Sequence, residues 1–81
     1  SEMETFSLQI ATELVNALGK DAAVSLLQQQ NPDYETIRQN SRSFRDIEKK
    51  GNSPDIRSSE FRELVKRAKQ YAKNTQGRSS T

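Results

Sequence analysis

Large apolar residues recur at every fourth position near the start of the chain. They are Phe6, Ile10, Leu14 and Leu18. A repeat of this kind places its members on one face of an amphipathic helix, and the pattern predicts such a helix over residues 5–18. Gly19 then suits the left-handed backbone conformation that often ends a helix, and Asp21 can cap the helix that follows.

A second, shorter apolar segment predicts a helix over residues 21–30. Pro32 ends this helix, because a proline disfavours the helical conformation of the residue before it and has no N–H to donate. The same proline fits the first turn of a new helix, for which Asn31 is the predicted N-cap.

The third predicted helix, over residues 33–49, has few apolar anchors. They are Tyr34, Ile37, Phe44 and Ile47. Their spacing keeps one narrow stripe on one side of the helix. Residues 40–43, Asn-Ser-Arg-Ser, have poor helix propensity, so a break near Ser41 that leaves two short helices is an open alternative. A turn is expected at residues 51–54, Gly-Asn-Ser-Pro.

The fourth predicted helix covers residues 59–74, with Ser58 or Ser59 as its cap. Its apolar stripe consists of Phe61, Leu64, Val65, Ala68, Tyr71 and Ala72. The predicted fold class is therefore all-α, a small irregular or orthogonal bundle of about four helices. We expect a single helical domain over residues 5–74, between a flexible N-terminus at residues 1–4 and a disordered tail at residues 75–81.

The composition excludes several chemistries. The 81 residues contain neither Cys nor His, so disulfides, Cys-based zinc sites and a histidine general base are absent. No serine has a base to activate it, and we expect no enzyme, no cofactor, no metal and no small-molecule substrate. No apolar run approaches the roughly 20 residues that cross a bilayer. The expected protein is soluble and intracellular, in the cytoplasm or with the nucleoid or nucleus, without a membrane partner.

Residues 21–45 consist of a short apolar segment, a break and then a polar segment that contains several arginines. This order resembles a helix-turn-helix, in which the second helix presents side chains to the bases of DNA. The resemblance implies a base-reading set made of Thr36, Arg38, Gln39, Asn40, Arg42 and Arg45. The alternative is an ordinary helical hairpin with a solvated polar face, and it is favoured by Asp33 and Glu35, which phosphate would repel.

Charge is unevenly distributed along the chain. Residues 55–81 contain seven Lys and Arg against three Asp and Glu, whereas residues 1–54 contain six against eight. The fourth helix carries a basic row at helical spacing, which consists of Arg62, Lys66, Lys69 and Lys73. Such a row can follow a phosphate backbone. The alternatives are a solvated charged face, with Glu63 paired to Arg67, or contact with an anionic membrane surface.

These patterns predict a small nucleic-acid-binding module with a regulatory or accessory role, for example in transcription. Its partner is expected to be duplex DNA, read by the third helix and held by the fourth. The competing function is a helical protein-interaction or adaptor domain, cut from a larger protein. In that case the apolar row Phe6, Ile10, Leu14 and Leu18 is a docking surface or a homodimer seam, and core packing is the other explanation of the same row.

Overall fold

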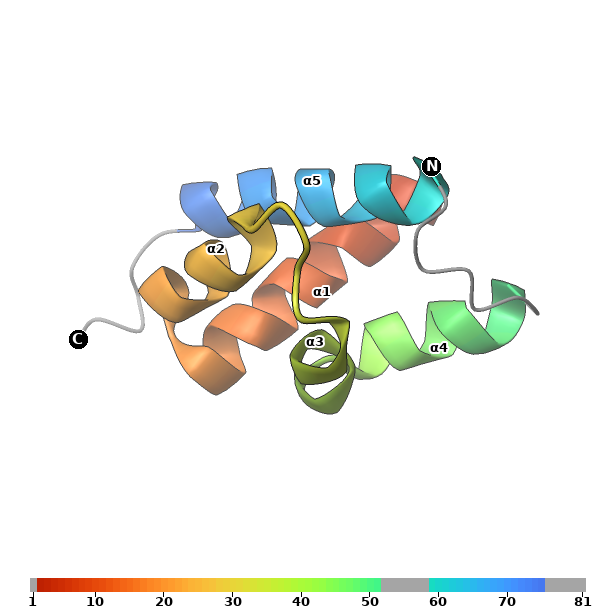
Figure 1. The fold of residues 1–81 in the computed structure, drawn as a ribbon, viewed down its shortest axis with the longest axis horizontal. Coiled ribbons are helices and arrows are strands. Elements are labelled where there is room, and N and C mark those ends of the chain that lie inside the picture. The colour runs from red at the N-terminus through yellow and green to blue at the C-terminus, as the bar shows by residue number, and fades with distance from the viewer. Residues whose placement is uncertain (1, 52–58, 76–81) are drawn as a thin grey trace.

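The computed structural model describes residues 2–51 and 59–75, and it confirms the all-α class within these ranges (Figure 1). The described helices are α1 (Glu2–Leu18), α2 (Lys20–Gln28), α3 (Tyr34–Asn40), α4 (Arg42–Gly51) and α5 (Ser59–Asn74). Helix α1 begins three residues earlier than predicted and includes most of the expected flexible N-terminus. The predicted turn after Gly51, the Ser58 cap and most of the predicted tail lie outside the described residues.

Helix α1 is the centre of the bundle and packs against each of the other four helices. In Figure 1, α2 and α5 lie on one side of it, and α3 and α4 lie on the other. The core is formed by buried apolar residues from all five helices, and α1 and α5 supply the largest share. Partly buried apolar residues pack against this cluster. Alanines 11, 23, 68 and 72 are buried to the backbone, and their small side chains let neighbouring helices approach closely.

The junction between α1 and α2 depends on Gly19. Its φ of +92° confirms the positive φ expected there, but its ψ of 156° lies outside the left-handed helical region. Helix α2 consequently starts at Lys20, and Gly19 itself occupies the N-cap position without a side-chain cap. The prediction that Asp21 caps this helix is therefore wrong, since Asp21 already lies within its first turn.

Helix α3 is capped by Asp33, so the prediction of Asn31 as N-cap is wrong. The Asp33 carboxylate accepts hydrogen bonds from the backbone N–H of Thr36 at 3.2 Å and from the Thr36 hydroxyl at 2.8 Å. These bonds lower the pKa of Asp33. Pro32 precedes the cap instead of occupying the first helical turn, and residues 29–33 form a connecting segment between α2 and α3.

The chain breaks at Ser41, which confirms the alternative of two short helices and overturns one continuous helix over 33–49. Ser41 is extended, with φ −135° and ψ 107°, and its hydroxyl accepts a hydrogen bond from the N–H of Phe44 at 3.1 Å. The Glu13 carboxylate of α1 holds this break from the other side. It accepts bonds from the Ser41 hydroxyl at 2.7 Å, the Ser43 hydroxyl at 2.7 Å and the Ser43 N–H at 3.0 Å.

Candidate nucleic-acid interface

The basic row predicted on the fourth helix is present on α5. Arg62, Lys66 and Lys73 are exposed and Lys69 is half-buried. Steps of four, three and four residues keep them on one face, over about 16 Å of helix axis. The opposite side of α5 contributes Leu64 and other apolar residues to the core, so packing fixes the direction in which the row points.

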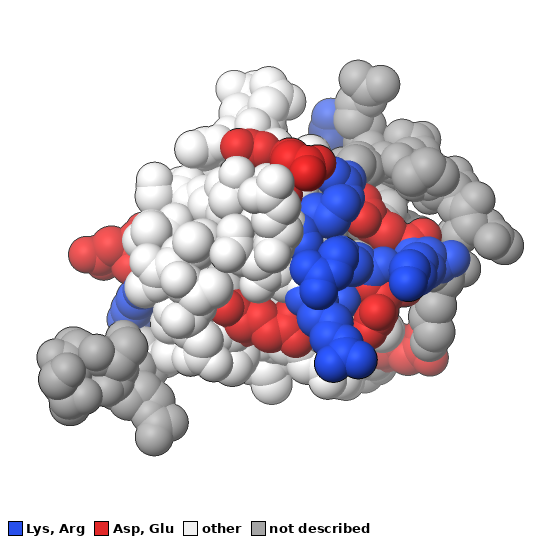
Figure 2. Space-filling view, turned by 90° about the horizontal axis from the view of Figure 1, so that it is seen from below, with Lys and Arg blue, Asp and Glu red and all other residues white. Residues whose placement is uncertain are grey.

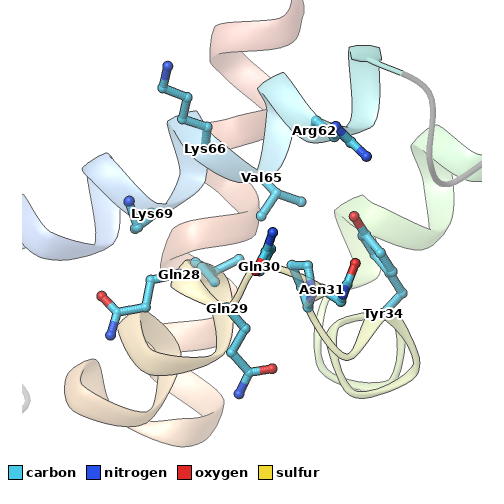
Figure 3. Close-up of a pocket in the computed structure, with 11 residues that line it drawn as sticks. Gln28, Gln29, Gln30, Asn31, Tyr34, Arg62, Val65, Lys66 and Lys69 are labelled. Atoms are coloured by element: carbon cyan, nitrogen blue, oxygen red, sulfur yellow. The ribbon is translucent and has the colours of Figure 1, made fainter.

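A groove of about 330 Å³ lies between α5 and the segment from the end of α2 to the start of α3. One wall carries a run of four carboxamides, which are Gln28, Gln29, Gln30 and Asn31. The other wall carries three members of the basic row, which are Arg62, Lys66 and Lys69. Leu27, Pro32, Tyr34 and Val65 complete the lining. In Figure 3, Gln30, Asn31 and Tyr34 point toward α5, whereas Gln29 points outward.

The carboxamides and cations that line this groove have no hydrogen-bond or ion-pair partner among the described residues. No Asp or Glu is among the described residues that line it. Because none of the described lining residues is acidic, the cations give the groove a positive potential, and the carboxamides offer hydrogen-bond donors at short range.

Arg67 lies beside the row but does not belong to it. Its guanidinium pairs with Glu63 at 3.1 Å, as predicted, and with Glu4 of α1 at 3.4 Å. These partners compensate its charge and tie α5 to α1. The alternative of a solvated charged face on α5, with Glu63 paired to Arg67, therefore stays open: the pair is present, and Arg62, Lys66 and Lys73 are exposed.

Arg38, the central arginine of the predicted base-reading set, is held by two carboxylates. Its Nε and Nη2 donate to the two carboxylate oxygens of Glu48 at 2.9 and 2.8 Å, and its Nη1 donates to Glu35 at 2.6 Å. The bonds to Glu48 outweigh the effect of burial and raise the pKa of Arg38 above its usual value. A guanidinium engaged on both edges has no free pair of donors for a guanine.

The other predicted base-reading residues of α3 also bond within the protein. Thr36 bonds to Asp33, Gln39 donates to Glu35 at 3.3 Å, and Asn40 donates to the Thr36 carbonyl at 2.9 Å. These contacts hold the surface of α3 together and leave its side chains poorly placed for base edges.

The arrangement of helices differs from the predicted helix-turn-helix over residues 21–45. Helix α2 packs on α1 and α5, whereas α3 packs on α1 and α4. The predicted recognition helix also ends at Asn40 after seven residues, because Ser41 leaves the helical conformation. The structure therefore does not bring α2 and α3 together as the compact pair that this motif requires.

Arg42 and Arg45, the last two predicted base-reading residues, lie on α4 with Lys49 as a third exposed basic group. Figure 2 shows Lys and Arg side chains gathered on the side where α3 and α4 lie, with acidic side chains beside them. The exposed Asp46 lies on the same helical face as these three cations, and Arg45 also donates to the Arg38 carbonyl at 2.7 Å. The positive charge here is partly compensated, unlike that of the α5 groove.

The apolar row of α1 lies inside the molecule. Ile10 is 2% exposed and Leu14 is 0% exposed, while Phe6 and Leu18 are partly buried against the same core. The structure thus supports the core interpretation of this row. Among the described residues, Leu8 is the large hydrophobic residue that is exposed, at 49%.

The carboxamide wall was missed as a candidate site from the sequence. Its signal was a run of four consecutive Gln and Asn residues before Pro32, but only the tertiary structure places that run opposite the basic row.

The residues that the structure describes contain no cluster of acids able to hold a metal, and none of their helices is long and apolar enough to cross a membrane. No protein-family model, curated protein or solved structure matches this chain.

Proposed function

We propose that this chain is a nucleic-acid-binding module with a regulatory or accessory role, and that the basic row of α5 contacts the phosphates. The observation that carries the proposal is the groove lined by Arg62, Lys66 and Lys69 of α5 and by the carboxamide wall, with no acid among the described lining residues. The proposed interface thus moves from α3, whose side chains are internally bonded, to α5 and the segment opposite it.

The electrostatic argument rests on where the charge is uncompensated. The net charge of the chain is only +2, which by itself gives weak attraction for a polyanion. The α5 row concentrates four cations along one helical face, and each cation that neutralises a phosphate releases bound counterions from the nucleic acid. Binding driven this way weakens as salt rises, which distinguishes it from apolar docking.

The test is a binding titration with fluorescein-labelled DNA, in single-stranded and duplex form, followed by fluorescence anisotropy at several salt concentrations. The variant Lys66→Glu/Lys69→Glu reverses two cations of the row. We expect it to weaken binding by at least about tenfold at low salt and to reduce the slope of log affinity against log salt by about two.

The control is Arg42→Glu/Lys49→Glu on α4, which changes the net charge by the same amount at two exposed positions. Circular dichroism establishes that both variants remain helical. Equal losses in the two variants would mean that net charge alone governs binding, and absence of binding by the unaltered protein would refute the proposal.

The adaptor function has less support in this structure. Ile10 and Leu14, on which a docking row would depend, are core residues. Leu8 is exposed but is isolated among the described residues, and single exposed apolar side chains are common on monomeric proteins. A salt-insensitive change of oligomeric state in sedimentation experiments, without DNA binding, would favour the adaptor.

A further inference from the structure

We propose that the groove between α5 and residues 28–34 accepts an unstacked nucleotide, so that the ligand of this protein is single-stranded nucleic acid. The inference rests on the proposed nucleic-acid binding and specifies the form of its ligand. It replaces the duplex DNA expected from the sequence pattern.

The first argument is the shape of the site. At about 330 Å³, the groove is at the small end of pockets that hold organic ligands, roughly 300 to 1,000 Å³. It is therefore a recess for a group of nucleotide size, and a double helix is far wider. Bases in a duplex are paired and stacked, so a single strand offers a base to a recess of this kind without first opening a duplex.

The second argument is the chemistry of the lining. The carboxamides of Gln30 and Asn31 each offer two N–H donors and one carbonyl acceptor, which suits the mixed donor and acceptor edges of a base. Arg62 stands on the facing wall and can pair with the phosphate of the same nucleotide. The groove thus combines groups for both ends of a nucleotide (Figure 3).

The third argument is the aromatic ring at one end of the groove. Tyr34 lines the groove and is half-buried, and its ring stacks on Phe44 with centroids 6.2 Å apart and an interplanar angle of 16°. Phe44 is fully buried, so the tyrosine is supported from within the protein. Aromatic rings fixed in this way are the usual stacking platforms for unpaired bases.

The fourth argument concerns the form of nucleic acid that the surface does not suit. Reading a duplex requires a protruding element with free side chains, and on α3 the side chains of Arg38, Gln39 and Asn40 are bonded within the protein. The uncommitted polar groups lie in a concavity instead. A concave site with free hydrogen-bond donors favours binding of an unstacked base over binding of a base edge in the groove of a DNA duplex.

The experiment compares a labelled single strand of about 12 nucleotides with its duplex, at one salt concentration, with inorganic polyphosphate as competitor. We expect the single strand to bind about tenfold or more tightly than the duplex. Polyphosphate should compete poorly, since it supplies the charge without a base.

Two variants test the base contacts. Tyr34→Leu retains apolar contact with Phe44 but removes the stacking surface, and its control is Tyr71→Leu, a partly buried tyrosine of α5 outside the groove. We expect Tyr34→Leu to weaken single-strand binding by about fivefold to 100-fold and to leave duplex binding nearly unchanged. Gln30→Ala/Asn31→Ala changes two side chains that make no hydrogen bond to another described residue, so it tests contacts with the base edge if Tyr34→Leu impairs folding.

The outcomes separate this inference from the proposed function. If the duplex binds as tightly as the single strand, or if polyphosphate competes equally well, the single-strand inference is overturned and nucleic-acid or polyanion binding by α5 remains. Normal single-strand binding by both the Tyr34 and the Gln30/Asn31 variants also overturns the inference. If neither form of DNA binds, the proposed function fails together with it.

Discussion

The capping of α4 by Glu13 gives the sharpest prediction about the fold. The carboxylate of α1 accepts three hydrogen bonds at the Ser41 break, two from serine hydroxyls and one from the Ser43 N–H. Ser41 is 0% and Ser43 is 7% exposed, so both hydroxyls depend on protein partners. Replacing Glu13 with Ala removes the acceptor for all three donors at once.

The expected loss follows from the number and kind of bonds. A hydrogen bond to a charged group contributes about 1.5 to 3 kcal/mol when shielded from water. Glu13 is partly exposed, and Gln9 lies 3.2 Å from the Ser43 hydroxyl as a substitute acceptor, so the three bonds do not add fully. We therefore expect Glu13→Ala to lower the free energy of unfolding by about 2 to 3 kcal/mol. For a domain of this size the melting temperature then falls by about 10 to 20 °C.

The pH dependence provides a second readout from the same site. Burial alone raises the pKa of Glu13, but the bonds from Ser41 and Ser43 and the charge of Arg45 outweigh it and hold the pKa below its ordinary value of 4.5. A carboxylate with a lowered pKa stabilises the folded state above its unfolded pKa, and that stability is lost as the pH falls through the folded pKa. The stability gap between the unaltered protein and Glu13→Gln should therefore narrow below pH 4.5.

The assay is thermal and urea unfolding followed by circular dichroism at neutral and acidic pH. Thr12→Ala serves as control, because the Thr12 side chain is exposed on the same helix and makes no hydrogen bond to another described residue. We expect the control to change stability by less than about 0.5 kcal/mol. If Glu13→Ala were as stable as Thr12→Ala, the break at Ser41 would not depend on α1 and the reasoning would be refuted.

Two further substitutions test the junction and the aromatic core. Gly19→Ala should destabilise the protein by about 1 to 3 kcal/mol in thermal unfolding, because φ +92° is strained for any side chain although no atom crowds the position, and equal or greater stability would contradict this. Phe44→Leu should cost about 1 to 3 kcal/mol in the same assay, since it removes the stack on Tyr34 and the edge contact with Phe61 at 5.7 Å while it keeps most of the volume. A loss below about 0.5 kcal/mol would show that these ring contacts are not specific.

The parts of the fold that depend on local periodicity could be predicted from the sequence. The apolar spacing correctly gave the end of α1 at Leu18 and both ends of α5 at residues 59 and 74. The region around Ser41 could not be decided, because the break is held by Glu13, which lies 28 residues earlier. The cap of α3 was misplaced because Asn31 and Asp33 are both good capping residues, and only the observed backbone distinguishes them.

The candidate site was predictable to the same extent. The basic row of α5 follows from its spacing on one helix, and the structure confirms that these side chains share a face. The base-reading set on α3 was also a candidate in the sequence, because nothing local shows that Glu48 binds Arg38 from across the helix break. The groove is formed by residues 27–34 and 62–69, two segments that are far apart in the sequence, so only tertiary packing reveals it.

The break at Ser41 and the proposed binding groove are connected through one aromatic residue. Because the chain turns at Ser41, Phe44 enters the core and contacts both Tyr34, on one wall of the groove, and Phe61, next to Arg62 on the other wall. The rings form a continuous series from Tyr34 through Phe44 to Phe61, and this series connects the two segments that carry the walls of the groove. A groove held this way loses little conformational freedom when a ligand enters, which favours binding by a small surface. We therefore expect the capping bonds of Glu13 to affect the proposed groove as well as the stability, since they hold the start of the helix that carries Phe44.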